Sequence, residues 1–273
     1  MAHPADTRRG RLLIIGGAAG PALLGRFVEL AGGPAARIVV IATASADPAA
    51  AEAEHVETFR TLGAGAVRPL RLDCRADALA EGVEPVLREA TAVYFTGGDQ
   101  ERITAVIGGT VTDSLLQELV AAGSLVLAGT SAGAAVMSGT MIVEGDGRGV
   151  SRAGVRTGPG LEFLPGVLID QHFAERGRIN RLLSAVAMYP HELGLGLDED
   201  TAILVDGDRF EVLGSGAVTV VDAGIATDIR VPSEGPIALT DACIHVLPAG
   251  YTFHLTGRRP LVDEPAAERG PVA

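Results

Sequence analysis

Four continuous apolar runs in the first half of the chain limit most strongly how it can fold. Each is followed at once by glycines or small polar residues, and the runs are Leu12–Ile15, Ile38–Ile41, Ala92–Phe95 and Leu125–Ala128. A run without polar alternation is apolar on both faces, which is typical of a strand in a parallel sheet that helices cover on both sides. The segments between the runs are long enough for crossover helices. We therefore predict an α/β fold, a three-layer α/β/α sandwich with a mostly parallel central sheet.

The second half of the chain has a different pattern. Residues 145–160 are rich in Gly and Arg without periodicity, and we expect a loop there. A strand at Val167–Ile169 and a helix from about Ala174 to Met188 should follow, and the chain is β-rich from Gly194 onward. We expect these later strands to extend the same sheet as extra C-terminal β-strands.

Length and charge limit the organisation and the partners. Residues 1–260 are expected to form a single domain, and residues 261–273 a loose tail. The formal net charge of -12 argues against nucleic acid or an anionic membrane as the main partner. Cys74 and Cys243 are too far apart for a zinc cluster, so we expect both to be reduced and buried. The apolar run near the N-terminus is too short for a signal or a membrane span, which favours the cytoplasm.

A serine stands in the turn that follows the fourth apolar run. The segment Gly129-Thr130-Ser131-Ala132-Gly133 fits the G-x-S-x-G pattern, in which a sharp strand-to-helix turn projects the serine hydroxyl. The amide of Ala132, at the start of the next helix, could donate to a developing oxyanion. The same residues also suit an ordinary turn with Ser131 as a helix cap. We interpret Ser131 as the candidate nucleophile.

The segment Thr96–Gln100 follows the neighbouring strand and offers groups that could serve Ser131. Gly98 could supply a second oxyanion donor, because glycine lets the backbone approach a ligand closely. Gln100 carries both a donor and an acceptor for a substrate amide or carboxylate. The alternative is a turn in which Asp99 caps the next helix.

A serine nucleophile needs a base, and one of the six histidines is well placed for that role. His172 lies in Asp170-Gln171-His172-Phe173, at the end of an apolar strand and before a helix. Arg176, Arg178 and Arg181 follow. They lie off the apolar stripe of that helix, where they could form an anion clamp or simply face solvent.

The third member of a triad would orient the histidine, and two arrangements are possible. Three acids, Asp198 to Asp200, precede an apolar strand and could supply it. An α/β-hydrolase would instead use Asp222 followed by His245 or His254. Those histidines alternate with apolar residues, as strand residues do, so we favour the order Ser131, His172, Glu199.

These segments, in this order, resemble peptidase family S51. The resemblance covers about residues 95–205 and rests on Thr96–Gln100, Gly129–Ala134, Asp170–Phe173 with the three arginines, and Gly196–Thr201. It implies a catalytic domain related to class I glutamine amidotransferases, with serine at the elbow and a triad of Ser131, His172 and Glu199. It implies no metal, no cofactor and a homodimer. It also implies substrate recognition by Gln100, Asp170, Gln171, Arg176, Arg178 and Arg181.

The resemblance further implies that the substrate is cyanophycin, a polyaspartate that carries arginine on each β-carboxyl. The product would be the β-aspartyl-arginine dipeptide. The arginines suit a terminal carboxylate, and each substrate guanidinium needs an acid, for which Glu144, Asp146 and Asp170 are candidates. Two other functions stay open: an α-aspartyl dipeptidase of the same family, and a non-catalytic binding protein on this scaffold.

Overall fold

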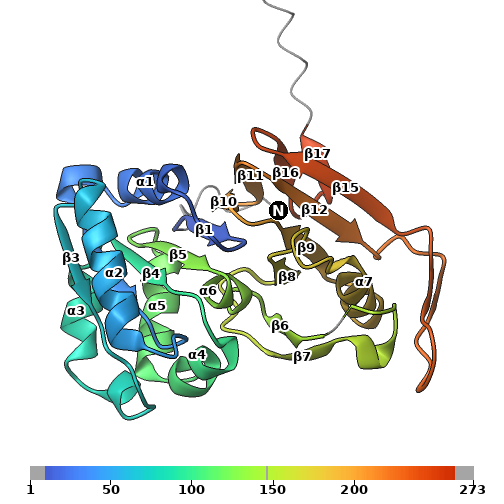
Figure 1. Ribbon diagram of the computed structural model, residues 1–273, viewed down its shortest axis with the longest axis horizontal. Helices are drawn as coiled ribbons and strands as arrows, with labels where there is room; N and C mark the ends of the chain where they lie inside the picture. The colour runs from blue at the N-terminus through green and yellow to red at the C-terminus, as the bar shows by residue number, and fades with distance from the viewer. Residues whose placement is uncertain (1–9, 146, 262–273) are drawn as a thin grey trace, which may run out of the picture.

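A nine-stranded sheet forms the centre of the fold in the computed structural model, which describes residues 10–145 and 147–261 (Figure 1). The strand order is β17-β16-β11-β10-β1-β5-β4-β2-β3. Five of these strands are mutually parallel: β1 (Leu12–Ile15), β2 (Arg37–Ile41), β3 (Ala66–Pro69), β4 (Ala92–Phe95) and β5 (Val126–Thr130). The four apolar runs thus lie in parallel strands, as predicted.

Helices cover both faces of the parallel strands, because alternate residues of each strand point to opposite sides. Leu13 and Ile15 share a buried cluster with Phe27 and Phe59, which belong to α1 (Pro21–Leu30) and α2 (Pro48–Thr61). Ile14 lies in a second cluster on the other face. That face is covered by α3 (Val83–Glu89), α4 (Gln100–Ile107), α5 (Val111–Ala121) and α6 (Ala132–Ala135). The α/β/α fold class is confirmed.

The C-terminal strands divide between two sheets, so the expectation of a single extended sheet was wrong in part. Antiparallel strands extend the central sheet: β10 (Thr201–Asp206), β11 (Arg209–Gly214), β16 (Thr252–His254) and β17 (Arg259–Leu261). A separate sheet has the order β15-β12-β9-β8. Its strands are β8 (Val167–Gln171), β9 (Leu193–Leu197), β12 (Ala217–Asp222) and β15 (Cys243–Pro248).

Glycines in β9 leave the space in which α7 packs against this second sheet. A Cβ on Gly194 would lie 2.6 Å from Val186 of α7 (Ile179–Met188), and one on Gly196 would lie 2.6 Å from the ring of Phe173. The glycine side of β9 therefore admits α7, while Leu193, Leu195 and Leu197 fill the core on the other side. Helix α7 begins five residues later than predicted, because the residues before it form a turn.

Two expectations about local structure were also wrong. The segment predicted as a loop contains β7 (Arg156–Pro159), which pairs with β6 (Thr140–Glu144) across an irregular register. Cys74 is exposed and Cys243 is partly buried, although both were expected to be buried. A second hairpin joins β13 (Asp228–Arg230) to β14 (Ala238–Thr240), and short 3₁₀ turns occur at Gly33–Ala35, Asp77–Leu79 and Arg152–Gly154.

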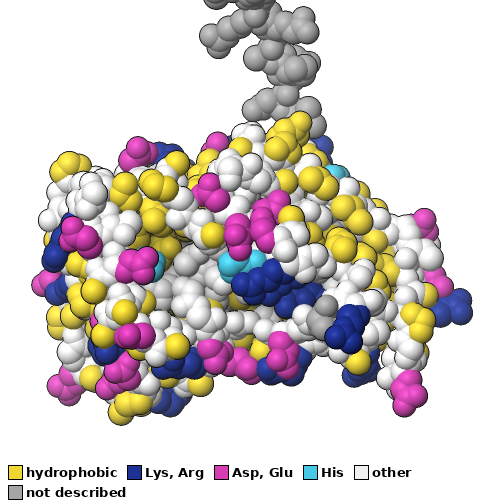
Figure 2. Space-filling view, viewed as in Figure 1, with side chains coloured by type: hydrophobic (Ala, Val, Ile, Leu, Met, Phe, Trp, Pro, Cys, Tyr) yellow, Lys and Arg dark blue, Asp and Glu magenta, His cyan; other side chains and the backbone are white. Residues whose placement is uncertain are grey.

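The ends of the chain lie largely outside the described residues. Leu261 closes β17, and the rest of the expected tail, residues 262–273, is not described. No helix in residues 10–145 or 147–261 is long and apolar enough to cross a membrane. Acidic side chains are spread over the visible face of the molecule, in keeping with its net charge (Figure 2).

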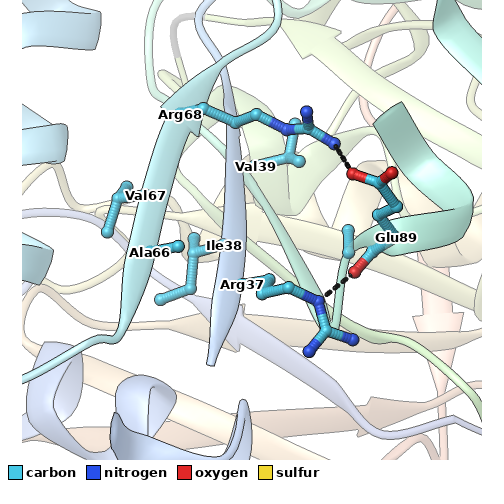
Figure 3. A pocket seen from close by; sticks show the side chains of 8 residues that line it. Arg37, Ile38, Val39, Ala66, Val67, Arg68 and Glu89 are labelled. Carbon is cyan, nitrogen blue, oxygen red and sulfur yellow. Dashed lines mark hydrogen bonds and ion pairs between the residues drawn. The ribbon is translucent and has the colours of Figure 1, made fainter. Parts of the chain in front are cut away.

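The free edge of the outer parallel strand β3 is protected from pairing with another chain. A pocket of about 170 Å³ lies beside it, lined by residues of β2 and β3 and by Glu89 and Ala90 (Figure 3). Arg68 of β3 reaches the carboxylate of Glu89 at 3.2 Å, and Arg37 bonds the Glu89 carbonyl. A charged residue and Pro69 on an edge strand discourage pairing with another chain.

Candidate active site

Ser131 stands at the carboxyl end of β5 in a backbone conformation that only a sharp turn produces. Its φ is 53° and its ψ is -108°. The turn requires both of its glycines, since a Cβ on Gly129 would lie 2.3 Å from the Gly133 carbonyl oxygen. A Cβ on Gly133 would lie 2.5 Å from the Phe95 carbonyl oxygen. The G-x-S-x-G segment therefore forms the strand-to-helix turn that the sequence predicts.

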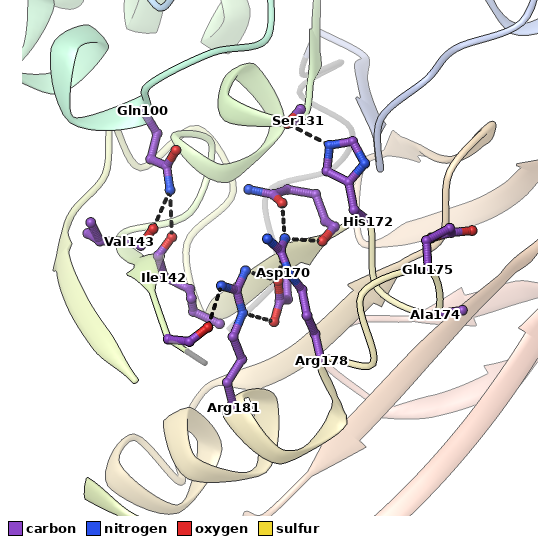
Figure 4. Close-up of polar contacts among 12 residues, drawn as sticks. Gln100, Ser131, Ile142, Val143, Asp170, His172, Ala174, Glu175, Arg178 and Arg181 are labelled. Carbon is purple, nitrogen blue, oxygen red and sulfur yellow. Dashed lines mark hydrogen bonds and ion pairs between the residues drawn. The ribbon is translucent and has the colours of Figure 1, made fainter. Parts of the chain in front are cut away.

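His172 and Glu199 complete a continuous chain of hydrogen bonds from Ser131. His172 Nε2 lies 2.9 Å from Ser131 Oγ (Figure 4), and His172 Nδ1 lies 2.6 Å from Glu199 Oε1. A carboxylate can only accept, so Nδ1 carries the proton and the lone pair of Nε2 faces the serine hydroxyl. This arrangement can remove the serine proton as the oxygen attacks a carbonyl.

The end of β1 holds in place the three loops that carry Ser131, His172 and Glu199. The amide of Ser131 donates to the Ile15 carbonyl at 3.0 Å, and that of His172 donates to Gly16 at 2.8 Å. The amide of Asp200, next to Glu199, donates to Gly17 at 2.8 Å. The His172 ring also packs on Gly17, where a Cβ would lie 2.3 Å from the ring. Sequence reasoning noted only that glycines follow the first apolar run and missed the role of Gly16 and Gly17.

The three neighbouring acids have separate partners. Asp198 accepts from the amides of Ala174 and Ala217, both at 3.1 Å. Asp200 accepts from the Gly20 amide at 2.7 Å and from the Ser215 hydroxyl at 2.9 Å. The outer two acids therefore fix the loops, which leaves Glu199 for the histidine.

Unused backbone amides lie beside Ser131. No hydrogen bond among the described residues uses the amides of Gly97, Gly98 or Ala132. Ala132 is fully buried, and a buried amide without an acceptor is rare in native structures. A Cβ on Gly97 would lie 3.4 Å from Ser131 Cβ, so this loop directly faces the serine. Asp99 caps α4 through the Glu101 amide, which was the structural alternative for that segment.

Asp170 and Arg181 bind each other in the interior. Arg181 Nε donates to Asp170 Oδ2 at 2.7 Å and a terminal nitrogen donates to Oδ1 at 2.5 Å (Figure 4). Both side chains are almost wholly buried. Arg178 bonds the carbonyl and the side-chain oxygen of Gln171. Burial, together with the charge of Arg181, lowers the pKa of Arg178 to about 10.

The remaining residues predicted for substrate recognition differ in whether their side chains bond to other residues of the fold. Arg176 is exposed and has no ion pair within the described part of the chain. Gln100 Nε2 donates to the Val143 carbonyl of β6 at 2.7 Å, so this end of the side chain is used within the fold. The role of each residue in recognition stays a prediction.

The candidate acids for the substrate guanidinium are mostly engaged. Glu144 pairs with Arg156 at 2.8 Å, and Asp170 pairs with Arg181. Asp146 lies outside the described residues.

Sequence reasoning missed Glu175, which accepts from the Glu199 amide at 3.2 Å. In the region of α6 and β8, a histidine lies between acidic side chains and arginines at the rim of a hollow (Figure 2).

The α/β-hydrolase arrangement does not form. His172, and not His245 or His254, bonds Ser131, and Asp222 is paired with Arg258 at 2.6 Å. His245 contacts Cys243 instead. In the part of the chain that the structure describes, no group of three or more His, Cys, Asp or Glu residues could hold a metal ion.

Comparison with known proteins places this chain in a family. The model of Peptidase family S51 matches residues 12–213. A cyanophycinase from Nostoc sp. (strain PCC 7120) is 38% identical over 98% of this chain and 92% of its own length. A cyanophycinase from Geminocystis herdmanii is 36% identical over 93% of this chain and 96% of its own length.

Solved structures share the fold at lower identity. A peptidase from an acI-B1 Actinobacterium superimposes with a TM-score of 0.67 at 22% identity, covering 91% of this chain and 98% of its own. A putative peptidase E from Listeria monocytogenes gives a TM-score of 0.54 at 18% identity, covering 76% of this chain and all of its own.

Proposed function

Since the chain belongs to peptidase family S51 and is a serine peptidase, we propose that it hydrolyses cyanophycin from a chain end to β-aspartyl-arginine dipeptides. The observation that carries this proposal is the pair of hydrogen bonds from Ser131 through His172 to Glu199. The names of relatives that align over nearly the whole chain support the choice of substrate.

In the proposed reaction, His172 Nε2 accepts the serine proton as Ser131 Oγ attacks the backbone carbonyl of an aspartyl unit. The tetrahedral intermediate collapses, His172 gives the proton to the leaving amine, and an ester to Ser131 remains. Water then attacks the ester with the same histidine as base, which releases the acid and restores the hydroxyl. Glu199 keeps the imidazole in its tautomer and stabilises the imidazolium.

The amides of Gly98 and Ala132 are the proposed oxyanion donors. Both lack an acceptor among the described residues, as a preorganised oxyanion site requires. Donors of this kind contribute on the order of 3–4 kcal/mol to transition-state stabilisation. The turn that exposes Ser131 therefore also supplies one of its donors.

For substrate binding, we assign direct contact to the groups that the fold leaves free. Arg176 is exposed and would bind a substrate carboxylate. Gln100 keeps its side-chain oxygen as an acceptor for a substrate amide, because only its nitrogen is engaged. Asp170 and Arg181 would act on the substrate indirectly, since their ion pair fixes the strand and helix that carry Gln171 and Arg178. The enzyme is proposed to act as a homodimer.

Product analysis tests the proposal. Purified protein is incubated with cyanophycin, and the products are identified by mass spectrometry, with Ser131→Ala as the matched control. We expect the β-aspartyl-arginine dipeptide from the wild type and at least ~10⁴-fold less from the variant. A parallel assay with Asp-X dipeptides separates the family alternative. Cleavage of the dipeptides alone would assign the chain to that activity and reject cyanophycin.

A further inference from the structure

Exposed apolar side chains gather along one strand of the second sheet. Six large hydrophobic residues are well exposed in the described part of the chain. Three of them lie on β15 or in the loop after it, and a fourth lies in the loop after β12, the strand that pairs with β15. These four are Ile244 (50% exposed), Val246 (64%), Ile225 (62%) and Tyr251 (47%). Apolar side chains cover the corresponding right-hand flank of the space-filling view (Figure 2). A cluster of this kind marks an interaction surface more often than a single exposed residue does.

The packing of α7 explains why Ile244 and Val246 are left uncovered. Both share a sheet face with their partners on β12, Val221 and Thr219. Helix α7 packs on β8, β9 and β12, where Val221 is fully buried with residues of the helix. The exposure of Ile244 and Val246 shows that this cover ends before β15. The outermost strand therefore has both a bare face and a free edge.

The free edge of β15 lacks the charged residue that each outer strand of the central sheet carries. On the central sheet, β3 carries Arg68 and Pro69, and β17 carries Arg259 and Pro260. The opposite edge strand of the second sheet, β8, is buried along its whole length. By contrast, β15 (Cys243–Pro248) carries no charged residue, and its one proline, Pro248, is its last residue. Natural proteins block edges that must stay unpaired, so an unblocked edge with apolar side chains indicates a strand that pairs.

We propose that the edge of β15 pairs antiparallel with β15 of a second copy of this chain. An antiparallel pair is self-complementary about a two-fold axis, so one strand supplies both halves of the interface. Charge favours a second copy at this place, because a chain of net charge -12 repels itself wherever acidic surfaces meet and β15 is uncharged. Tyr251, in the loop after β15, and Ile225, in the loop after β12, would extend the buried area. The inference rests on the proposed homodimer and adds the surface that forms it.

A charge placed on the strand tests the proposal. Val246→Lys puts two ammonium groups into the proposed interface, whereas Val111→Lys changes an equally exposed apolar residue on α5 (57% exposed). Molar mass is measured by light scattering over a range of concentrations, and amide hydrogen exchange of residues 243–248 is followed. We expect a dimer for the wild type and for Val111→Lys, and dimerisation at least about tenfold weaker for Val246→Lys, with faster exchange in β15.

The possible outcomes distinguish the proposed β15 surface from the proposed homodimer. A wild type that is monomeric at all concentrations overturns the homodimer and this surface together. A Val246→Lys variant that dimerises as tightly as the wild type overturns the surface and leaves the homodimer intact. Hydrolysis of cyanophycin is measured on the same samples, and its failure in every sample counts against the proposed substrate and not against the interface.

Discussion

At the residue scale, the proposed site is built from backbone conformations with positive φ, which residues other than glycine rarely adopt. Ser131, His172 and Asp200 have φ values of 53°, 49° and 47°. Such conformations cost of order 1–3 kcal/mol each and persist only where the surroundings hold them. The consecutive carbonyls of Ile15, Gly16 and Gly17 provide that hold. The motif predicted the serine turn, but the sequence carries no sign that one strand end would fix all three loops.

Glu199→Gln tests the role of the acid. The amide can donate to Nδ1 and so favours the wrong tautomer of His172, with its proton facing the serine. We expect kcat to fall by about 10²–10⁴, less than for loss of the serine or the histidine. Asp200→Asn is not a suitable control because Asp200 holds two loops, so the exposed Glu162→Gln serves instead. Equal activity of Glu199→Gln and the wild type would remove Glu199 from the mechanism.

Glu192 should make stability depend on pH. One carboxyl oxygen accepts from Thr140 and the other is buried without a partner, and burial raises the pKa of this group above 4.5. A raised folded-state pKa stabilises the protein below the unfolded-state pKa, and that stabilisation is lost as pH rises through the folded value. Glu192→Gln should remove this loss of stability at higher pH, because glutamine does not titrate.

The measurement is the free energy of unfolding in urea between pH 4 and pH 7. The difference between Glu192→Gln and the wild type should move in favour of the variant as pH rises. A difference that is constant across this range would show that the Glu192 carboxyl does not titrate in the native state over that interval.

At the element scale, the continuous apolar runs were sufficient to predict four of the five parallel strands, whereas the second sheet was not predicted. Gly194 and Gly196 lie inside β9 and make room for α7 and Phe173. Such a fit depends on a helix that packs from elsewhere in the chain, so local pattern could not reveal it. The β6–β7 hairpin was missed for a similar reason, because its irregular register interrupts alternation.

Gly17→Ala tests the contact between the end of β1 and the histidine. The new Cβ would collide with the His172 ring, and the φ of 128° at Gly17 also disfavours alanine. We expect kcat to fall by at least ~10²-fold, because the displaced ring loses its alignment with Ser131. The control is Gly25→Ala on α1, where a Cβ meets nothing within 4 Å. Wild-type kcat in Gly17→Ala would contradict the packing described.

The buried Asp170–Arg181 pair should matter for stability. Arg181→Met leaves an unpaired carboxylate in the interior and should cost about 3–5 kcal/mol in the free energy of unfolding. Arg176→Met changes an exposed arginine of the same segment and should stay within about 0.5 kcal/mol, while raising KM for cyanophycin. Equal destabilisation by both variants, measured in urea, would show that the ion pair has no special role. The sequence placed these charges near each other but could not reveal which of them would pair.

At the scale of the whole molecule, the proposed site lies where the two sheets meet. The central sheet supplies Ser131 and the free amides, and the second sheet supplies His172 after β8 and Glu199 after β9. Strand β1 joins the two through its terminal carbonyls. The sequence suggested the order of these three residues, since Ser131 and His172 each follow an apolar strand and Glu199 precedes one. It was not enough for the second sheet, where α7 packs on three strands that are separated in the sequence.

The central claim is that Ser131 is a nucleophile activated by His172, and covalent labelling tests it most directly. Folded protein is treated with a fluorophosphonate, and the modified peptide is identified by mass spectrometry, with Ser131→Ala and His172→Ala treated in parallel. We predict one adduct per chain, on Ser131, which is absent from the first variant and forms far more slowly in the second. No adduct on the folded wild type, or equal labelling of Ser131→Ala, would contradict the account.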